Sequence, residues 1–176
     1  RDHVFVGPAV AWEISFLEHY QSFGFETGSP EHEGYAAELK ATQESVRRMR
    51  DAGIRVLVGG DYGLNITPHG TYAKELQYFT DYFGFSPGEA LQAATKHGGE
   101  AFMPDGRLGT LETGKIADMV IVKGNPLEQI TLLQDADNIR AVIKDGQIYA
   151  GLLHKHSPHQ KNPDQLNQLL GASPCN

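Results

Sequence analysis

The sequence contains almost no cysteine and no long apolar run. Its 176 residues include one cysteine, Cys175, which excludes an internal disulfide framework and a cysteine-rich zinc site. No apolar segment approaches the roughly 20 residues that a membrane-spanning helix needs, and none resembles a signal peptide. We therefore expect a cytoplasmic protein, although the same composition would suit a periplasmic one.

The sequence also has no excess of positive charge. The formal net charge is −7, and no stretch is strongly basic. Nucleic acids and anionic membrane surfaces are therefore not expected as partners. With 40% hydrophobic and 21% charged residues, the chain has the composition of an ordinary globular protein with about one good core.

The first predicted element begins unusually close to the first residue. Val4 to Val10 reads as a short apolar strand, and only three residues precede it. Because natural domains seldom open on a buried strand, we expect the chain to be the C-terminal part of a larger protein. Residues 11–32 show no clear period and are rich in aromatic residues, Gly and Pro, which predicts a long functional loop or lid.

A helix and a second strand follow this segment. Apolar residues recur at steps of four and three between Glu33 and Ala52, which predicts a helix that Gly53 ends. The apolar run Ile54 to Val58 is a predicted buried strand. Strand, loop, helix and strand form a βαβ unit of an α/β fold, so the two strands should be parallel.

The second strand leads directly into Gly59-Gly60-Asp61-Tyr62-Gly63. Parallel α/β folds place their catalytic groups just past the C-terminal ends of buried strands. The flanking glycines would let the backbone approach a ligand closely. Asp61 is therefore the first candidate functional residue, and the alternative is an Asx-turn that only closes the strand.

Two further helices are predicted before residue 100. Residues 72–83 carry apolar side chains on one face and end at Gly84. Ser86 to Glu89 matches a capping box with proline at the first helical position. This box opens a third helix that reaches about His97 and that Gly98-Gly99 should close.

The pattern changes beyond Pro104, where short strands alternate with turns. Strands are predicted at 119–122, 139–143 and 147–149, and Asp145-Gly146 is a strong hairpin signal. We therefore divide the chain into residues 1–103, residues 104–150 and a polar C-terminal arm of residues 151–176. The arm contains His154, His156 and His159, which we expect to be solvated.

Several motifs in a fixed order carry a resemblance to a known family. They are Asp51 to Gly63, Pro68-His69-Gly70, Ser86 to Thr95, Gly106 to Val122, Gly124 to Leu127 and Val142 to Gly146. Together they cover roughly residues 36–149. This segment resembles the C-terminal part of the amidohydrolase superfamily of metal-dependent hydrolases, in its imidazolonepropionase and Xaa-Pro dipeptidase (prolidase)-like branch.

The resemblance implies both a fold and a metal site. Residues 1–103 would supply C-terminal strands and helices of a TIM-like (β/α)8 barrel, and residues 104–150 would supply part of a small β-sandwich. Asp61 would match the aspartate of the eighth strand, which binds a divalent metal and accepts a proton from the attacking water. Zinc is the expected metal, as one or two ions. The family usually has Thr or Ser before this aspartate, whereas this chain has Gly60.

The other metal ligands of the family have no counterpart in the sequence. These are a His-x-His pair on the first strand, a bridging Lys or Glu on the fourth, and single histidines on the fifth and sixth; all would lie upstream of Arg1. A catalytic zinc needs about three protein ligands. We therefore expect activity only together with the N-terminal portion of the same enzyme. The other expected partners are a small-molecule substrate and further copies of the protein in a homo-oligomer.

Three further residues are candidate substrate-binding groups. Tyr62 adjoins Asp61, and His69 lies in the following loop. Trp12 belongs to the aromatic segment that could form an apolar wall or lid. Each has a structural alternative, which is packing for Tyr62 and Trp12 and surface hydrogen bonding for His69.

The predicted function is hydrolysis of an amide-type or related C–N bond, as in a dipeptide, cyclic amide, aryl amide or carbamate. The alternative is a non-catalytic binding module or fragment that lacks the metal-binding histidines. A nucleotide-binding role is disfavoured. The segment Gly109 to Lys115 imitates a phosphate-binding loop, but Ile116 stands where Ser or Thr would bind magnesium.

Overall fold

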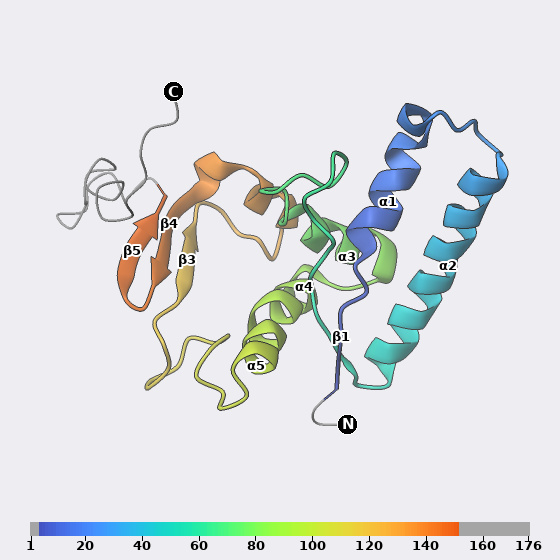
Figure 1. The fold of residues 1–176 in the computed structure, drawn as a ribbon. Helices are drawn as coiled ribbons and strands as arrows, with labels where there is room; N and C mark the ends of the chain where they lie inside the picture. The colour runs from blue at the N-terminus through green and yellow to red at the C-terminus, as the bar shows by residue number, and fades with distance from the viewer. Residues whose placement is uncertain (1–3, 152–176) are drawn as a thin grey trace, which may run out of the picture.

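The computed structural model of the chain describes residues 4–151. These residues form a helical group around two short strands, followed by a separate three-stranded sheet (Figure 1). No helix in the described part of the chain is long and apolar enough to span a bilayer. Apart from its first residue, the predicted polar arm with its histidines lies outside the described residues.

The two strands of the helical group are parallel, as predicted for the βαβ unit. In β1 (Phe5–Val6) and β2 (Arg55–Val56), Phe5 pairs with Arg55 and Val6 pairs with Val56. The backbone N–H of Leu57 also donates to the carbonyl oxygen of Val6 at 2.8 Å. Both strands are shorter than the apolar runs that predicted them.

Helix α1 (Val10–His19) corrects the prediction of a long loop at residues 11–32. It buries Val10, Ile14 and Phe16 and continues into the short 3₁₀ helix η1 (Tyr20–Phe23). The apolar and aromatic residues lie around much of the helix, so the sequence lacks the clean alternation of faces by which a surface helix is recognised. Only the part after η1 is a connection between helices.

Helix α2 (Pro30–Asp51) confirms the predicted helix and begins three residues earlier. Ser29 is its N-cap, and the Ser29 side chain accepts the backbone N–H of His32 at 3.3 Å. Leu39 and Val46 face inward and are buried. Gly53, with φ at 73°, follows the helix in the left-handed conformation that favours glycine.

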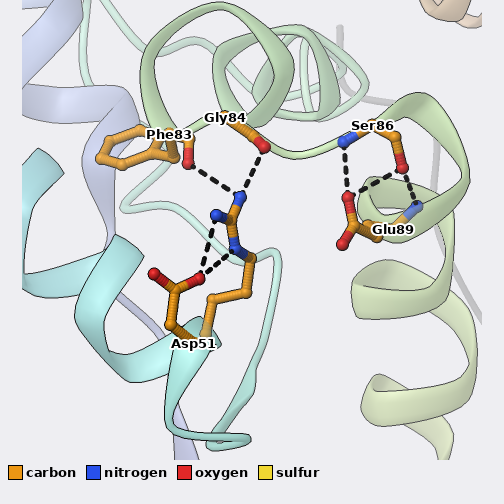
Figure 2. A network of polar contacts seen from close by, with 6 residues as sticks. Asp51, Phe83, Gly84, Ser86 and Glu89 are labelled. Carbon is orange, nitrogen blue, oxygen red and sulfur yellow. Dashed lines mark hydrogen bonds and ion pairs between the residues drawn. The ribbon is translucent and has the colours of Figure 1, made fainter.

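Helices α3 (Lys74–Phe83) and α4 (Pro87–Gln92) confirm the next two predictions. The capping box is complete, because Ser86 N–H donates to Glu89 Oε2 at 2.7 Å and Glu89 N–H donates to Ser86 Oγ at 3.3 Å. Figure 2 shows these bonds beside the carbonyl groups that end α3.

Arg50 ties the end of α2 to the end of α3. Its guanidinium donates to the carbonyl oxygens of Phe83 and Gly84 and pairs with Asp51 Oδ1 at 3.0 Å (Figure 2). The last carbonyl groups of a helix have no partner within the helix, and a cation beside them is favourable. This contact therefore fixes the two helices that flank β2.

The prediction that Gly98-Gly99 ends the third helix is wrong. The chain continues through the π-helical segment η2 (Ala93–His97) into α5 (Gly98–Phe102). A Cβ atom added to Gly99 would lie 2.7 Å from the Cα atom of Gly109, and one added to Gly109 would lie 2.5 Å from the carbonyl oxygen of Thr95. Both glycines therefore allow close backbone contact between α5, η2 and the following segment.

One hydrophobic core joins the helices to β2. Its largest completely buried side chains include Phe79 and Phe83 of α3, Ile14 of α1 and Val46 of α2. Ile130, from the 3₁₀ helix η3 (Ile130–Gln134), belongs to the same core. Residues that follow Pro104 therefore pack directly against the helical group.

The last elements form an antiparallel sheet in the order β3-β4-β5, which confirms the three predicted strands. They are β3 (Met119–Val122), β4 (Ile139–Lys144) and β5 (Gln147–Ala150), with the short 3₁₀ helix η4 (Ala136–Asn138) before β4. Asp145 and Gly146 both have positive φ, at 49° and 76°, as a two-residue hairpin turn requires. Asp118 Oδ1 accepts the Asp145 backbone N–H at 2.7 Å.

Candidate functional site

Asp61 lies in the loop that follows the C-terminal end of β2, and its side chain is exposed. Asp135 and Asn125 accept backbone N–H groups two residues ahead, at 2.9 and 3.1 Å, as Asx-turns do. Asp61 makes no such bond and no ion pair to any residue within 4–151. Its carboxylate is therefore available to a ligand.

Glu75 lies beneath this loop and was not singled out from the sequence. It comes from α3 and is 1% exposed. The Tyr62 hydroxyl donates to its Oε2 atom at 3.4 Å, whereas its Oε1 atom is buried and has no hydrogen-bond partner among the described residues. Burial raises the pKa of Glu75 to about 7, and the Tyr62 hydroxyl and the nearby backbone N–H groups of Gly59 and Gly60 lower it only in part.

Gly60 is required by the same packing. A Cβ atom at this position would lie 2.7 Å from the Tyr62 ring, 2.9 Å from the Ala11 Cβ atom and 3.0 Å from Glu75 Oε2. A Thr or Ser side chain does not fit here without displacing these groups. Glycine at this position, where the family usually has Thr or Ser, therefore leaves the space that Glu75 and Tyr62 occupy.

Tyr62, Tyr72 and His69 form a chain of contacts on the outer side of the loop. The Tyr62 and Tyr72 rings meet edge to face, with centroids 4.7 Å apart. The Tyr72 hydroxyl is 2.8 Å from His69 Nδ1. Burial and the neighbouring Glu75 raise the pKa of Tyr62 above its usual range, so its hydroxyl stays protonated and donates.

Trp12 lies in a different contact group. Its ring centroid is 6.4 Å from that of Phe16 and 6.4 Å from that of Phe23, within an aromatic cluster between α1 and α2. The cluster extends to Phe25 and Tyr35 through Phe16. The structure thus gives Trp12 a packing role, and its contact with substrate stays a prediction.

A cavity of about 160 Å³ opens between α1, α3 and the loop that joins β2 to α3. Tyr62, Tyr78 and Lys74 line it, and Lys74 Nζ is paired with Glu18 Oε2 at 2.8 Å. Thr67 also lines it; its Oγ1 atom is buried and has no hydrogen-bond partner among the described residues. The cavity is large enough for several water molecules or one small ring.

A complete metal site is not found among residues 4–151. No group of three or more His, Cys, Asp or Glu side chains in that range could hold a metal ion. An exposed carboxylate without an internal partner fits one metal ligand, but about three are needed. Asp61 by itself therefore offers one potential ligand and not a complete site.

The position of Glu75 in the sequence indicated a place on the inward face of α3, but a charged residue is not expected to be buried there. Glu75 lies four residues before Phe79, which is completely buried, so it shares the inward face of the helix. A carboxylate on such a face is rarely buried unless it has a partner. Its partner is the Tyr62 hydroxyl of the preceding loop, which sequence spacing does not identify.

Known proteins resemble this chain over the same region. The model of the amidohydrolase family matches residues 25–149. Ochratoxinase from Aspergillus niger is 33% identical over 114 residues, which is 64% of this chain and 22% of that protein. Imidazolonepropionase from Geobacillus kaustophilus is 30% identical over 115 residues, which is 65% of this chain and 27% of that protein.

Solved structures show the same relationship. The crystal structure of A. niger ochratoxinase has a TM-score of 0.72 at 24% identity, covering 85% of this chain and 32% of that one. A Xaa-Pro dipeptidase with methionine bound in its active site has a TM-score of 0.65 at 29% identity, covering 84% and 35%. This chain thus spans 22–35% of the length of these relatives. Because the family model covers more than half of the sequence, the chain belongs to the amidohydrolase family.

Proposed function

We propose that this chain is the C-terminal part of a metal-dependent hydrolase of amide-type or related C–N bonds. The observation that carries the proposal is the position of Asp61, an exposed carboxylate past the end of β2 with no internal partner. In the proposed enzyme, residues 1–103 are part of a (β/α)8 barrel and residues 104–150 are part of a small β-sandwich. The composition favours a cytoplasmic location.

Asp61 has two roles in this proposal. It is one ligand of a divalent metal, with zinc as the expected ion, and the N-terminal portion of the enzyme supplies the other ligands. What such a metal supplies when bound is a lower pKa for water and polarisation of the substrate carbonyl. The Asp61 carboxylate accepts the proton of the attacking water and returns it to the leaving nitrogen.

Tyr62 and His69 are the proposed substrate contacts next to Asp61. The Tyr62 hydroxyl is directed to Glu75, so its ring rather than its hydroxyl is offered to a substrate. Tyr72 holds Nδ1 of His69, which leaves Nε2 as the ring nitrogen for substrate. The substrate is a dipeptide, a cyclic amide, an aryl amide or a carbamate, and the similarity to a Xaa-Pro dipeptidase supports the first of these. Trp12 would contact only a substrate that extends to the aromatic cluster.

A non-catalytic binding module is the second candidate function. It is favoured by one observation, which is that the described residues contain no group of three metal-ligating side chains. In that case Asp61 would bind a ligand or partner without turnover. The two candidates differ in whether a chain with the missing histidines accompanies this one.

Native mass spectrometry with metal analysis of the same sample tests the proposal. We expect a mass that includes an upstream polypeptide, with one or two metal ions for each Asp61. Asp61→Asn should then lower kcat by about 1,000-fold or more, because one group serves as ligand and proton acceptor. Asp81→Asn, a change at an exposed aspartate of α3, is the matched control. A lone, metal-free and inactive 19.3 kDa species would establish the binding module instead.

A further inference from the structure

We propose that Glu75 is a positioning residue for Asp61 and holds the loop that carries Asp61 from its buried side. This inference rests on the proposed function, because it concerns the carboxylate to which that function assigns the chemistry. Glu75 itself is buried beneath the loop and is not placed in contact with the substrate.

The contacts of Glu75 lie on both sides of Asp61 in the sequence. Gly60, the residue before it, packs so closely on the carboxylate that an added Cβ atom would lie 3.0 Å from Oε2. Tyr62, the residue after it, donates its hydroxyl to Oε2 at 3.4 Å. One buried carboxylate thus contacts the residue on each side of Asp61 while the Asp61 side chain stays exposed.

The loop that carries Asp61 is not held by backbone hydrogen bonds of the sheet. The last backbone bond of the β-ladder is from Leu57 N–H to the Val6 carbonyl, and the next backbone bond begins at Gly63, whose N–H donates to Thr67. Between them, from Val58 to Tyr62, no backbone N–H donates to a backbone carbonyl within the described residues. Glu75 therefore contacts a stretch of backbone that the sheet does not hold.

The packing around Gly60 shows how closely the loop that carries Asp61 fits against α1 and α3. A Cβ atom on Gly60 would lie 3.0 Å from Glu75 Oε2 and 2.9 Å from the Ala11 Cβ atom. The loop is thus held between α1 and α3, with almost no space for displacement toward either helix. A buried carboxylate with one unpartnered oxygen costs stability that an apolar residue on α3 would not, so its contacts with the loop are the reason we infer for its presence.

Two substitutions separate positioning from a merely structural role. Glu75→Gln keeps a side-chain oxygen that can accept the Tyr62 hydroxyl of the loop, whereas Glu75→Leu removes every acceptor. Glu13→Leu is the matched control. Glu13 is a half-buried carboxylate of α1 with an unpartnered Oε2 atom, but its other oxygen accepts the Thr42 hydroxyl of α2 at 3.3 Å.

Steady-state kinetics on a dipeptide substrate test the inference in the protein that carries this chain together with the N-terminal portion. Glu75→Leu should lower kcat by about 100-fold and change KM by no more than about threefold, since a supporting residue orients the reacting group without binding substrate. Glu75→Gln should recover kcat to within about tenfold of the unsubstituted protein, and Glu13→Leu should stay within about twofold. An unchanged kcat in Glu75→Leu, or no recovery in Glu75→Gln, would overturn the inference.

Amide hydrogen exchange on the same proteins distinguishes failure of this inference from failure of the proposed function. Exchange of the backbone amides at residues 59–62 should be at least about tenfold faster in Glu75→Leu, because the loop loses its contact with the carboxylate, and unchanged in Glu13→Leu, with or without turnover. If the unsubstituted protein neither binds metal nor hydrolyses substrate, the proposed function fails, and accelerated exchange still supports the hold of Glu75 on the loop. Equal exchange in all variants contradicts that hold.

Discussion

The helical group around β2 and the sheet β3-β4-β5 bury their apolar side chains to very different extents. Phe79 and Phe83 of α3 are completely buried, whereas Val120 and Ile121 of β3 are 56% and 43% exposed. Neighbouring residues of a strand point to opposite faces, so both faces of β3 are open. The two regions are also at opposite sides of the molecule in Figure 1.

This difference indicates that the helical group, and not the sheet, positions Asp61. The loop with Asp61 packs against α1 and α3, and the buried side chains of these two helices belong to one hydrophobic core. The sheet has only Ala141 fully buried, and it joins the helical group through η3 and the glycine contact of α5. We therefore expect substitutions in the helical group to act on stability far more strongly than those in the sheet.

Phe79→Ala should have the largest effect, because it empties a fully enclosed volume between the helices. We expect the free energy of unfolding to fall by about 3–5 kcal/mol, measured by urea denaturation. Val120→Ala, at the exposed position of β3, should change it by less than about 1 kcal/mol. Similar losses from both substitutions would remove the proposed difference between the two regions.

Gly109→Ala tests the contact that joins the regions. Its φ of 92° and the Thr95 carbonyl oxygen 2.5 Å from an added Cβ atom predict a loss of about 3 kcal/mol. Gly106 is a matched control, because its φ is also positive, at 76°, but an added Cβ atom would meet nothing within 4 Å. Gly106→Ala should cost about 1 kcal/mol, from backbone strain alone. Thermal unfolding of both variants gives the difference, and equal costs would argue against close packing at Gly109.

Glu75 should make stability depend on pH in the acid to neutral range. Its pKa is about 7 in the folded protein, against an ordinary value of 4.5, so the folded state binds the proton more tightly than the unfolded state does. Its contribution is fully present below pH 4.5 and is lost as the pH rises through 7, by up to about 3 kcal/mol. Tyr62, which faces Glu75, stays protonated throughout this range.

Glu75→Gln should remove this dependence, so that its free energy of unfolding rises relative to the unsubstituted protein between pH 5 and 8. Glu89 is a control of opposite sign, because hydrogen bonds from Ser86 lower its pKa and its contribution is lost as the pH falls. Denaturant titrations across the pH range measure both. Parallel curves for Glu75→Gln and the unsubstituted protein would count against a raised pKa.

Ser86→Ala should have the smallest effect of the series. It removes the hydroxyl that accepts the Glu89 N–H and breaks the capping box of α4, which is worth about 1 kcal/mol. Ser45→Ala, at an exposed position within α2, should be nearly neutral. Urea denaturation of the two variants compares a cap with an ordinary helix position, and equal stabilities would show that the cap contributes nothing.

The sequence was most informative where neighbouring residues decide the conformation. The stop after α2 at Gly53, the capping box at Ser86 and the hairpin at Asp145-Gly146 are all local signals, and the structure has each of them. The family could also be predicted, because its motifs are contiguous and occur in order. Helix α1 was missed since its burial on several sides hides the helical period.

Tertiary structure alone decided how residues distant in the sequence are used. The sequence placed Asp61 after a buried strand, because an apolar run followed by glycines and a carboxylate is a local pattern. It did not show that Gly98-Gly99 serves close packing instead of a helix end, or that Glu75 contacts the residues on both sides of Asp61. Those contacts depend on where the chain returns in space, and residue spacing along one element carries no information about that return.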